Sequence, residues 1–160
     1  MSIVESSSQA RDTDVGERPV LARRVYVCGA LHSAGDLTTA RELYEFAADV
    51  CESCGFIAYL PHKTSDPVHH SGMSPVDVFV KDYAAVLAAD VIVAFIGEAS
   101  SGMGAELGIA FERNKQVIAV YEKTERPSPF ILGMLSKMKT PLMSAYESKQ
   151  DLRQILISSL

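Results

Sequence analysis

Apolar residues in this chain fall into short continuous runs, separated by longer stretches with helical spacing. Runs typical of buried strands cover 25–28, 56–60, 91–95 and 117–121, and 141–143 is a candidate fifth strand. Helical spacing and start signals predict helices over 37–54, 75–89, 105–113, 130–137 and 148–156. Strands that are apolar throughout and alternate with helices favour a parallel sheet. We therefore predict an α/β fold, with a five-stranded parallel sheet and helices on both faces.

Two of the predicted helices begin at recognisable capping residues. Ser74 precedes Pro75, and Asp77 follows the serine by three positions, which is the pattern of a capping box. Asp36 or Thr38 is placed to cap the first helix. These signals predict where the two helices begin.

Composition and charge favour a single-domain protein that binds neither a nucleic acid polymer nor a membrane. The first 22 residues are polar without an apolar period, which predicts a mobile tail, and 23–160 is long enough for one domain. The net charge is −5 and the basic residues are scattered, which argues against a nucleic acid polymer or a membrane surface as partner. The chain contains neither an apolar run of about 20 residues nor a signal-peptide core, so we expect a cytoplasmic protein.

The cysteines favour free thiols. Their number is three, and Cys28 falls in a predicted strand. Cys51 and Cys54 have the spacing of a metal or redox pair, but they lie near the end of a predicted helix rather than at its start. Two unreactive thiols are therefore favoured over zinc or redox chemistry.

The segment from 100 to 108 gives the strongest indication of function. It follows a predicted strand and reads Ser-Ser-Gly-Met-Gly-Ala-Glu-Leu-Gly. Its glycines allow a tight turn that exposes backbone N–H groups, and its serines add hydroxyl donors where the helix dipole favours an anion. The expected phosphate-binding residues are Ser100, Ser101, Gly102 and Gly104. Glu106 lies in the predicted first turn of the helix, where its negative charge would oppose binding of a phosphate. We therefore expect Glu106 to have a function other than phosphate binding.

A second carboxylate is expected near Glu106. Asp82 lies within a predicted helix, and its neighbours one turn away are the apolar residues Val78, Phe79, Ala85 and Val86. Because ligands of parallel sheets bind at the carboxyl ends of the strands, the loops at Gly29 and Ser100 are expected to face one crevice that both acids can reach. Displacement at a sugar anomeric carbon uses such a pair, and carboxyl groups about 5 Å apart suit the retaining reaction. Glu106 would be the nucleophile. The apolar neighbours of Asp82 and the second carboxylate are expected to raise the pKa of Asp82, which would then hold the proton that the departing base needs.

Each of these residues also has a purely structural interpretation. A glutamate in a first helical turn more often stabilises the helix dipole than acts in catalysis. Asp82 could form a salt bridge, and the glycines could form a plain tight turn. The polar loop predicted over 61–72 contains His62, His69 and His70, which lack the acidic neighbours of a metal site. We therefore predict no metal and no cofactor, and treat His62 as a candidate base contact.

Three segments together resemble the nucleoside 2-deoxyribosyltransferase superfamily. They are Val25-Tyr26-Val27-Cys28-Gly29-Ala30, the stretch from Val80-Lys81-Asp82 into Ala89-Asp90-Val91-Ile92-Val93-Ala94, and 100–108. The similarity covers about 24–123 and is nearest to the 2′-deoxynucleoside 5′-monophosphate N-glycosidases. It implies a flavodoxin-like (Rossmann-like) sheet, Glu106 as nucleophile and Asp82 as the acid that assists at the base. It also implies a homodimer or larger homo-oligomer in which a partner subunit closes the site, with Ser128 and Ser136 both candidates for a partner-chain phosphate contact.

The resemblance also distinguishes between branches of the superfamily. Transferases that act on free nucleosides carry an aspartate where this chain has Ser100, and an aspartate there would repel a 5′-phosphate. Ser100, Gly102 and the backbone around Gly104 are thus implied to bind that phosphate. The segment Gly29, Ala30, Leu31 and His32 is implied to line the sugar.

The function predicted from the sequence is hydrolysis of a nucleoside 5′-monophosphate to free base and (deoxy)ribose 5-phosphate. Two alternatives stay open: base exchange between nucleosides, and a nucleotide-binding sensor module without turnover. A dinucleotide dehydrogenase is disfavoured, because no Gly-x-Gly-x-x-Gly follows the first strand.

Overall fold

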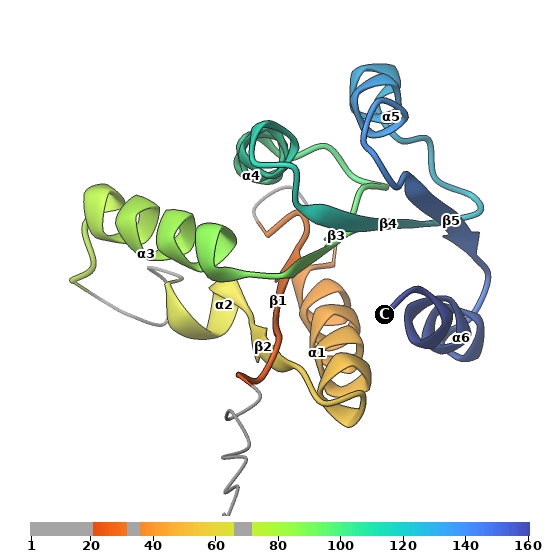
Figure 1. The fold of residues 1–160 in the computed structure, drawn as a ribbon, viewed down its shortest axis with the longest axis horizontal. Helices are drawn as coiled ribbons and strands as arrows, with labels where there is room; N and C mark the ends of the chain where they lie inside the picture. Colours follow the sequence, from red (N-terminus) through yellow and green to blue (C-terminus); the bar gives the residue numbers. More distant parts are fainter. Residues whose placement is uncertain (1–20, 32–35, 66–71) are drawn as a thin grey trace, which may run out of the picture.

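The computed structural model describes residues 21–31, 36–65 and 72–160, and the alternation of strands and helices expected from the apolar pattern is confirmed (Figure 1). In chain order the elements are β1 (Arg24–Cys28), α1 (Leu37–Ser53), β2 (Ile57–Tyr59), α2 (Pro61–Thr64), α3 (Pro75–Ala88), β3 (Val91–Phe95), α4 (Ser101–Glu112), β4 (Gln116–Glu122), α5 (Pro129–Leu135), β5 (Leu142–Tyr146) and α6 (Lys149–Ser159).

The five strands form one parallel sheet in the order β2-β1-β3-β4-β5. This is the flavodoxin-like order, so the predicted fold class is confirmed. From β1 the chain first adds β2 on one side and then returns to add β3 on the other side, so the strand order reverses between β1 and β3. These two strands pair directly, and Cys28 lies opposite Ala94. Helices leave a crevice at such a point, beyond the carboxyl ends of the two strands.

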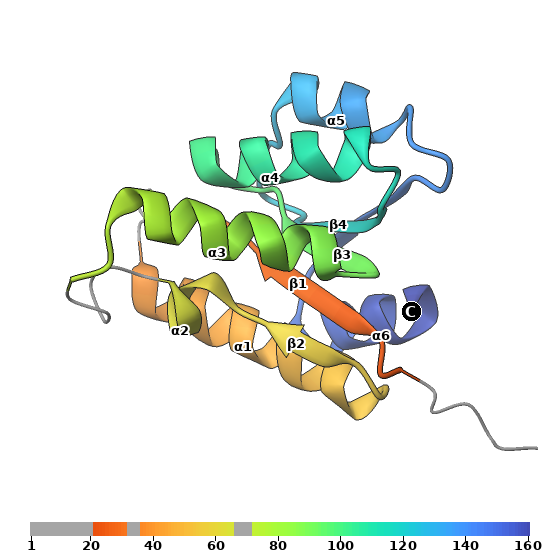
Figure 2. The ribbon, with the colours of Figure 1, turned by 60° about the vertical axis from the view of Figure 1, so that its left-hand side comes forward.

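Helices cover both faces of the sheet (Figures 1 and 2). The helices α1 and α6 pack on one face, and α3, α4 and α5 pack on the other. Because side chains alternate along a strand, Val25 and Val27 of β1 point toward α1, whereas Tyr26 and Cys28 point toward α3 and α4. The polar groups of β1 therefore share a face with the helices that carry Asp82 and Glu106.

The predicted starts of α1 and α3 are confirmed. Asp36 caps α1, and its carboxylate accepts hydrogen bonds from the backbone N–H groups of Thr38 and Thr39. The capping box at Ser74 and Asp77 is formed in full at the start of α3. All three cysteines are free; Cys28 and Cys51 are buried and Cys54 is exposed.

The structure corrects the prediction for 100–108. The helix α4 begins at Ser101 rather than at 105, so Gly102 and Gly104 lie inside its first turn and Glu106 lies in its second. The Ser100 side chain caps this helix by accepting the N–H of Met103, 3.4 Å away. Each glycine costs a helix about 1 kcal/mol, and the cap and the packing of the apolar face outweigh that cost. Among the described glycines only Gly55 and Gly72 have positive φ, so the glycines of α4 do not form a tight turn.

The remaining differences concern short elements. The loop predicted over 61–72 begins with the short helix α2, because Pro61 is suited to a first helical position. The fifth strand is longer than predicted, at Leu142–Tyr146. None of the described helices has the length and apolar character to span a membrane.

Candidate active site

A cavity of about 420 Å³ lies at the carboxyl ends of β1 and β3, where the sheet topology predicts a ligand. Its volume is within the range of small-molecule sites, about 300–1,000 Å³. The cavity is lined by Val27, Cys28, Gly29, Leu31, Tyr44, Pro61, His62, Ser65, Val78, Asp82, Ala99, Ser100, Ser101, Gly102, Met103 and Glu106. The loops at Gly29 and Ser100 and both predicted carboxylates thus meet in one place.

Glu106 reaches the cavity from α4 and is half-buried. The hydroxyl of Tyr26, a fully buried residue of β1, donates a hydrogen bond to Glu106 Oε1 at 2.6 Å. Burial and the charge of Glu106 raise the pKa of Tyr26, so the phenol keeps its proton and remains a donor. Tyr26 therefore fixes the position of the Glu106 carboxyl group in the cavity.

Burial, together with the charge of Asp82, raises the pKa of Glu106 to about 7, although hydrogen bonds from Tyr26 and Cys28 oppose this rise. The sequence predicted a raised pKa for Asp82, whereas the raised pKa found in the structure is that of Glu106. At neutral pH, Glu106 is therefore divided between its protonated and ionised forms. Only the ionised form can attack an electrophilic carbon.

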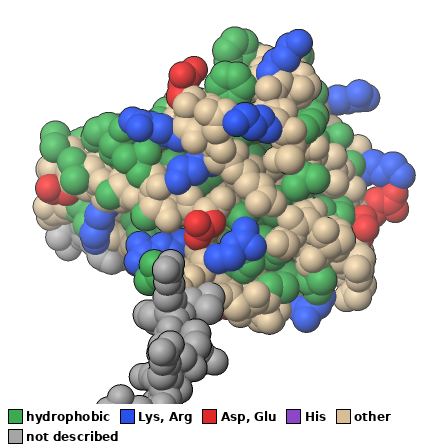
Figure 3. Space-filling view, viewed as in Figure 1, with side chains coloured by type: hydrophobic (Ala, Val, Ile, Leu, Met, Phe, Trp, Pro, Cys, Tyr) green, Lys and Arg blue, Asp and Glu red, His purple; other side chains and the backbone are tan. Residues whose placement is uncertain are grey.

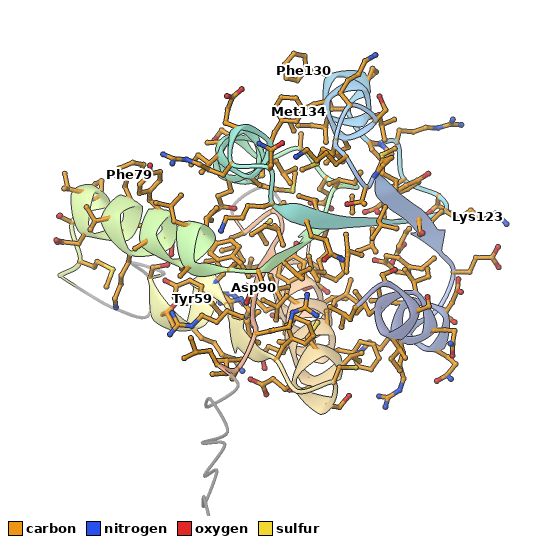
Figure 4. The ribbon with its side chains drawn as sticks, viewed as in Figure 1. Tyr59, Phe79, Asp90, Lys123, Phe130 and Met134 are labelled. Atoms are coloured by element: carbon orange, nitrogen blue, oxygen red, sulfur yellow. The ribbon has the colours of Figure 1, made fainter. Side chains whose placement is uncertain are left out.

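Asp82 reaches the same cavity from α3 and is also half-buried. Its oxygen Oδ1 accepts a hydrogen bond from the Tyr59 hydroxyl at 2.8 Å and another from Ser65 Oγ at 2.6 Å. Figure 4 shows Tyr59 below α3 and close to α2. The salt bridge considered as an alternative for Asp82 is not among the ion pairs of the described residues.

The tyrosines at the two carboxylates, Tyr26 and Tyr59, were not identified from the sequence. They lie opposite each other in the register of β1 and β2, and their rings stack. The available signal was a tyrosine in each of two predicted buried strands, since a buried tyrosine hydroxyl needs a partner. Ser65 gave no such signal, because its contact with Asp82 depends on how α2 packs against α3.

The start of α4 forms another wall of the cavity through Ser100, Ser101, Gly102 and Met103. The first N–H groups of a helix lack backbone partners and, together with the helix dipole, favour an anion. A Cβ added at Gly102 would meet only Ser100 Oγ, at 3.9 Å, so the glycine leaves this turn open toward the cavity. The position of the predicted phosphate site is therefore compatible with the structure.

The predicted sugar-lining segment is only partly in the cavity. Gly29 and Leu31 line it, whereas Ala30 is buried and its carbonyl accepts a hydrogen bond from the Tyr44 hydroxyl. A Cβ at Gly29 would lie 2.4 Å from the Tyr44 ring, which explains the glycine. Gly104 does not line the cavity, and His32 lies outside the described residues.

His62 lines the cavity and is 4% exposed, with Nε2 3.1 Å from Glu45 Oε1. Burial lowers the pKa of His62, although Glu45 opposes this shift. Glu45 therefore holds the His62 ring at the wall of the cavity, and its contact with a base stays a prediction. His69 and His70 lie outside the described residues, and within the described parts of the chain there is no cluster of three or more potential metal ligands.

The family model described as nucleoside 2-deoxyribosyltransferase matches residues 25–146, which span β1 to β5 and hold both carboxylates. The chain belongs to this family. The resemblance carried by the three sequence segments is therefore confirmed. No curated protein matches the chain.

Solved structures with the same fold include enzymes that act on N-glycosyl bonds. A CMP N-glycosidase from Clostridium botulinum is 22% identical with a TM-score of 0.67, covering 86% of this chain and 100% of its own. A 2-deoxyribosyltransferase from Bacillus psychrosaccharolyticus is 18% identical with a TM-score of 0.58, covering 81% of this chain and 90% of its own. A conserved protein from Enterococcus faecalis is 20% identical with a TM-score of 0.66, and the match covers 87% of this chain and 99% of that protein. At these identities the likeness shows a common fold.

Proposed function

We propose that this member of the family hydrolyses the N-glycosidic bond of (deoxy)nucleoside 5′-monophosphates, releasing the free base and (deoxy)ribose 5-phosphate. The observation that carries the proposal is that one cavity holds Glu106, Asp82 and the first turn of α4. These supply a nucleophile, a proton donor and an anion site, which are the three groups that the reaction requires.

The first step is displacement at the sugar. Ionised Glu106 attacks C1′ with the oxygen that does not accept from Tyr26, forming a C1′–O bond as the C1′–N bond breaks. The electron pair of the broken bond goes to the base, which takes a proton from Asp82. The products of this step are the free base and a glycosyl ester of Glu106.

The second step returns the enzyme to its initial state. Water attacks C1′, and Asp82, now ionised, accepts a proton from this water. The C1′–O bond to Glu106 breaks, and the carboxylate is released together with the sugar 5-phosphate. The chemistry needs two carboxyl groups and water, and we propose no metal or cofactor for it.

The choice of a monophosphate rests on Ser100 and the start of α4. Ser100 carries no charge, lines the cavity and caps α4, so a 5′-phosphate would meet N–H groups and hydroxyls rather than a carboxylate. A carboxylate at this position, as in transferases that act on free nucleosides, would disfavour the phosphate. The substitution thus supports a phosphorylated substrate over a free nucleoside.

We further propose that the protein works as a homodimer or larger homo-oligomer. Large apolar side chains are exposed on α3 and α5: Val76, Phe79, Val80 and Phe130. Figure 3 shows apolar surface over α3 at the left and over α5 at the top, and Figure 4 places Phe79 and Phe130 on the outer side of this helix layer. Since α3 also carries Val78 and Asp82 into the cavity, a second copy on this surface would lie beside the cavity.

Base transfer is the second candidate, favoured by the description of the family. A panel of ribo- and deoxynucleosides and their 5′-monophosphates, each incubated with and without a second free base, tests both functions. Hydrolysis predicts base and sugar phosphate from monophosphates, with no new nucleotide formed. Formation of a new nucleoside from the added base would instead support transfer, and tight nucleotide binding without base release would indicate a sensor module.

A further inference from the structure

Both hydroxyl groups that hold Asp82 donate to the same carboxyl oxygen. Tyr59 and Ser65 each bond to Oδ1, at 2.8 and 2.6 Å, and among the described residues no donor or acceptor meets Oδ2. A carboxyl oxygen offers about two lone-pair sites to hydrogen-bond donors. Within the described parts of the chain, both hydrogen bonds to Asp82 thus go to one oxygen and none goes to the other.

The two donors are held in place independently of Asp82. Tyr59 is fixed by stacking on Tyr26 and by the pairing of β1 with β2. Ser65 is buried at the end of α2, and its backbone N–H donates to the Pro61 carbonyl at 2.8 Å. Two elements other than α3 therefore determine the orientation of the Asp82 carboxyl group.

The single proton of the Ser65 hydroxyl has two acceptors within reach. Its oxygen lies 2.6 Å from Asp82 Oδ1 and 3.0 Å from the Pro61 carbonyl. The carboxyl contact is the shorter one, and hydrogen bonds to an ionised acceptor are the stronger kind. Ser65 therefore donates to Asp82 whenever Asp82 is ionised.

We infer that Tyr59 and Ser65 are positioning residues that direct the acidic proton of Asp82 to Oδ2, the oxygen left for the departing base. The inference rests on the proposed N-glycosidase function. With both lone-pair sites of Oδ1 occupied by hydroxyl donors, a proton arriving on Asp82 binds Oδ2. From there it passes to the base nitrogen as the C1′–N bond breaks, and the carboxylate that remains is stabilised by the same two hydroxyls.

This role predicts a specific kinetic signature. Loss of a positioning donor should weaken proton delivery in the transition state and leave binding of the substrate nearly intact, so kcat falls and KM changes little. The loss should also depend on the leaving group. A base that departs readily without a proton makes less use of Asp82, whereas a merely structural defect would affect all substrates alike.

The variants Tyr59→Phe and Ser65→Ala test the inference, because each removes a hydroxyl and little else. Tyr83→Phe and Ser158→Ala are matched controls, since Tyr83 follows Asp82 on α3 without a hydrogen bond to it and the Ser158 hydroxyl donates to the Ile155 carbonyl. Base release is measured on the best nucleotide substrate of the wild type and on the analogue whose base carries an electron-withdrawing fluorine.

We expect kcat on the parent nucleotide to fall about tenfold in each variant, the loss of one hydrogen bond, with KM within about twofold of wild type. The deficit should be smaller on the fluorinated analogue, and both controls should match wild type. Wild-type kcat in Tyr59→Phe and Ser65→Ala, or an equal deficit on both substrates, would overturn the positioning role while leaving the proposed function intact. A wild-type protein that releases no base from any nucleotide would overturn the proposed function itself, and this inference with it.

Discussion

Tyr26 stacks on Tyr59 with ring centroids 5.3 Å apart and planes 11° from parallel, and each ring presents its hydroxyl to a different carboxylate of the cavity. Tyr26 donates to Glu106 and Tyr59 to Asp82, although the two acids come from different helices. The pair is fixed by the register of β1 and β2, so neighbouring strands set the placement of the two acids. Sites supported by strands hold their geometry better than sites on loops.

The raised pKa of Glu106 predicts the pH dependence of base release. Burial and the charge of Asp82 raise this pKa to about 7, and only the ionised carboxylate attacks C1′, so the acid side of the pH profile should rise through about 7. The measurement is kcat/KM against pH for the best nucleotide. An acid limb near 4.5, the ordinary value for a glutamate, would contradict the account.

The substrate phosphate has a second pKa of about 6, so a control must separate it from Glu106. The variant Tyr26→Phe removes a donor that stabilises ionised Glu106 and should move the acid limb to higher pH. The pKa of the free nucleotide is unchanged by this substitution. A limb that stays in place in Tyr26→Phe would assign it to the substrate.

The same raised pKa makes Glu106 a source of instability at high pH. Its folded pKa of about 7 lies above its ordinary 4.5, so proton-linked stability is fully present below about pH 4.5 and is lost as the pH rises through 7. Glu106→Gln removes this loss and should be more stable than wild type by about 3 kcal/mol at pH 8, and by less than about 1 kcal/mol at pH 5. Urea unfolding at both pH values measures the difference. Equal stability at pH 8 would show that Glu106 is well solvated.

A charge at position 100 should select against phosphorylated substrates. Aspartate caps helices as well as serine does, so Ser100→Asp should preserve α4 while its carboxylate repels a 5′-phosphate. We expect KM for nucleoside monophosphates to rise at least about tenfold, equivalent to about 1.4 kcal/mol. Ser100→Asn is the uncharged control of matching size. An equal effect of both substitutions would remove charge repulsion as the cause.

The exposed apolar surface on α3 predicts self-association. Phe79 is 59% exposed, and Phe79→Ser should lower the molar mass measured by sedimentation at a fixed protein concentration. Leu21→Ser is the matched control, because Leu21 is 88% exposed but precedes β1 at a distance along the chain from α3. A wild-type protein that sediments as a monomer would refute the proposed oligomer.

The sequence predicted the fold well because its signals are local and strong. Continuous apolar runs gave the strands, and Asp36 and the Ser74–Asp77 box gave the starts of α1 and α3. The start of α4 was misplaced, because glycines at 102 and 104 read as a loop, whereas the Ser100 cap and buried residues such as Leu107 stabilise a helix there. The low helix propensity of glycine is a weak signal, and tertiary packing can outweigh it.

The site was only partly predictable. Glu106 and Asp82 stood out because acids beside glycines or apolar residues are unusual, and the cavity contains both. Tyr59 and Ser65 could not be found in this way, because their contacts with Asp82 depend on strand register and on the packing of α2 against α3. Hydroxyl residues are too common in sequences for their roles to be recognised without those distances.

The most direct test of the account is base release by wild type and by Glu106→Gln on the same nucleoside 5′-monophosphate, with folding of both checked by circular dichroism. The amide keeps the size of the side chain and can still accept from Tyr26, but it cannot act as the nucleophile. We predict free base and sugar 5-phosphate from wild type and a rate at least about a thousandfold lower from a folded Glu106→Gln. Equal base release by the two proteins would contradict the central claim that Glu106 forms the bond to C1′.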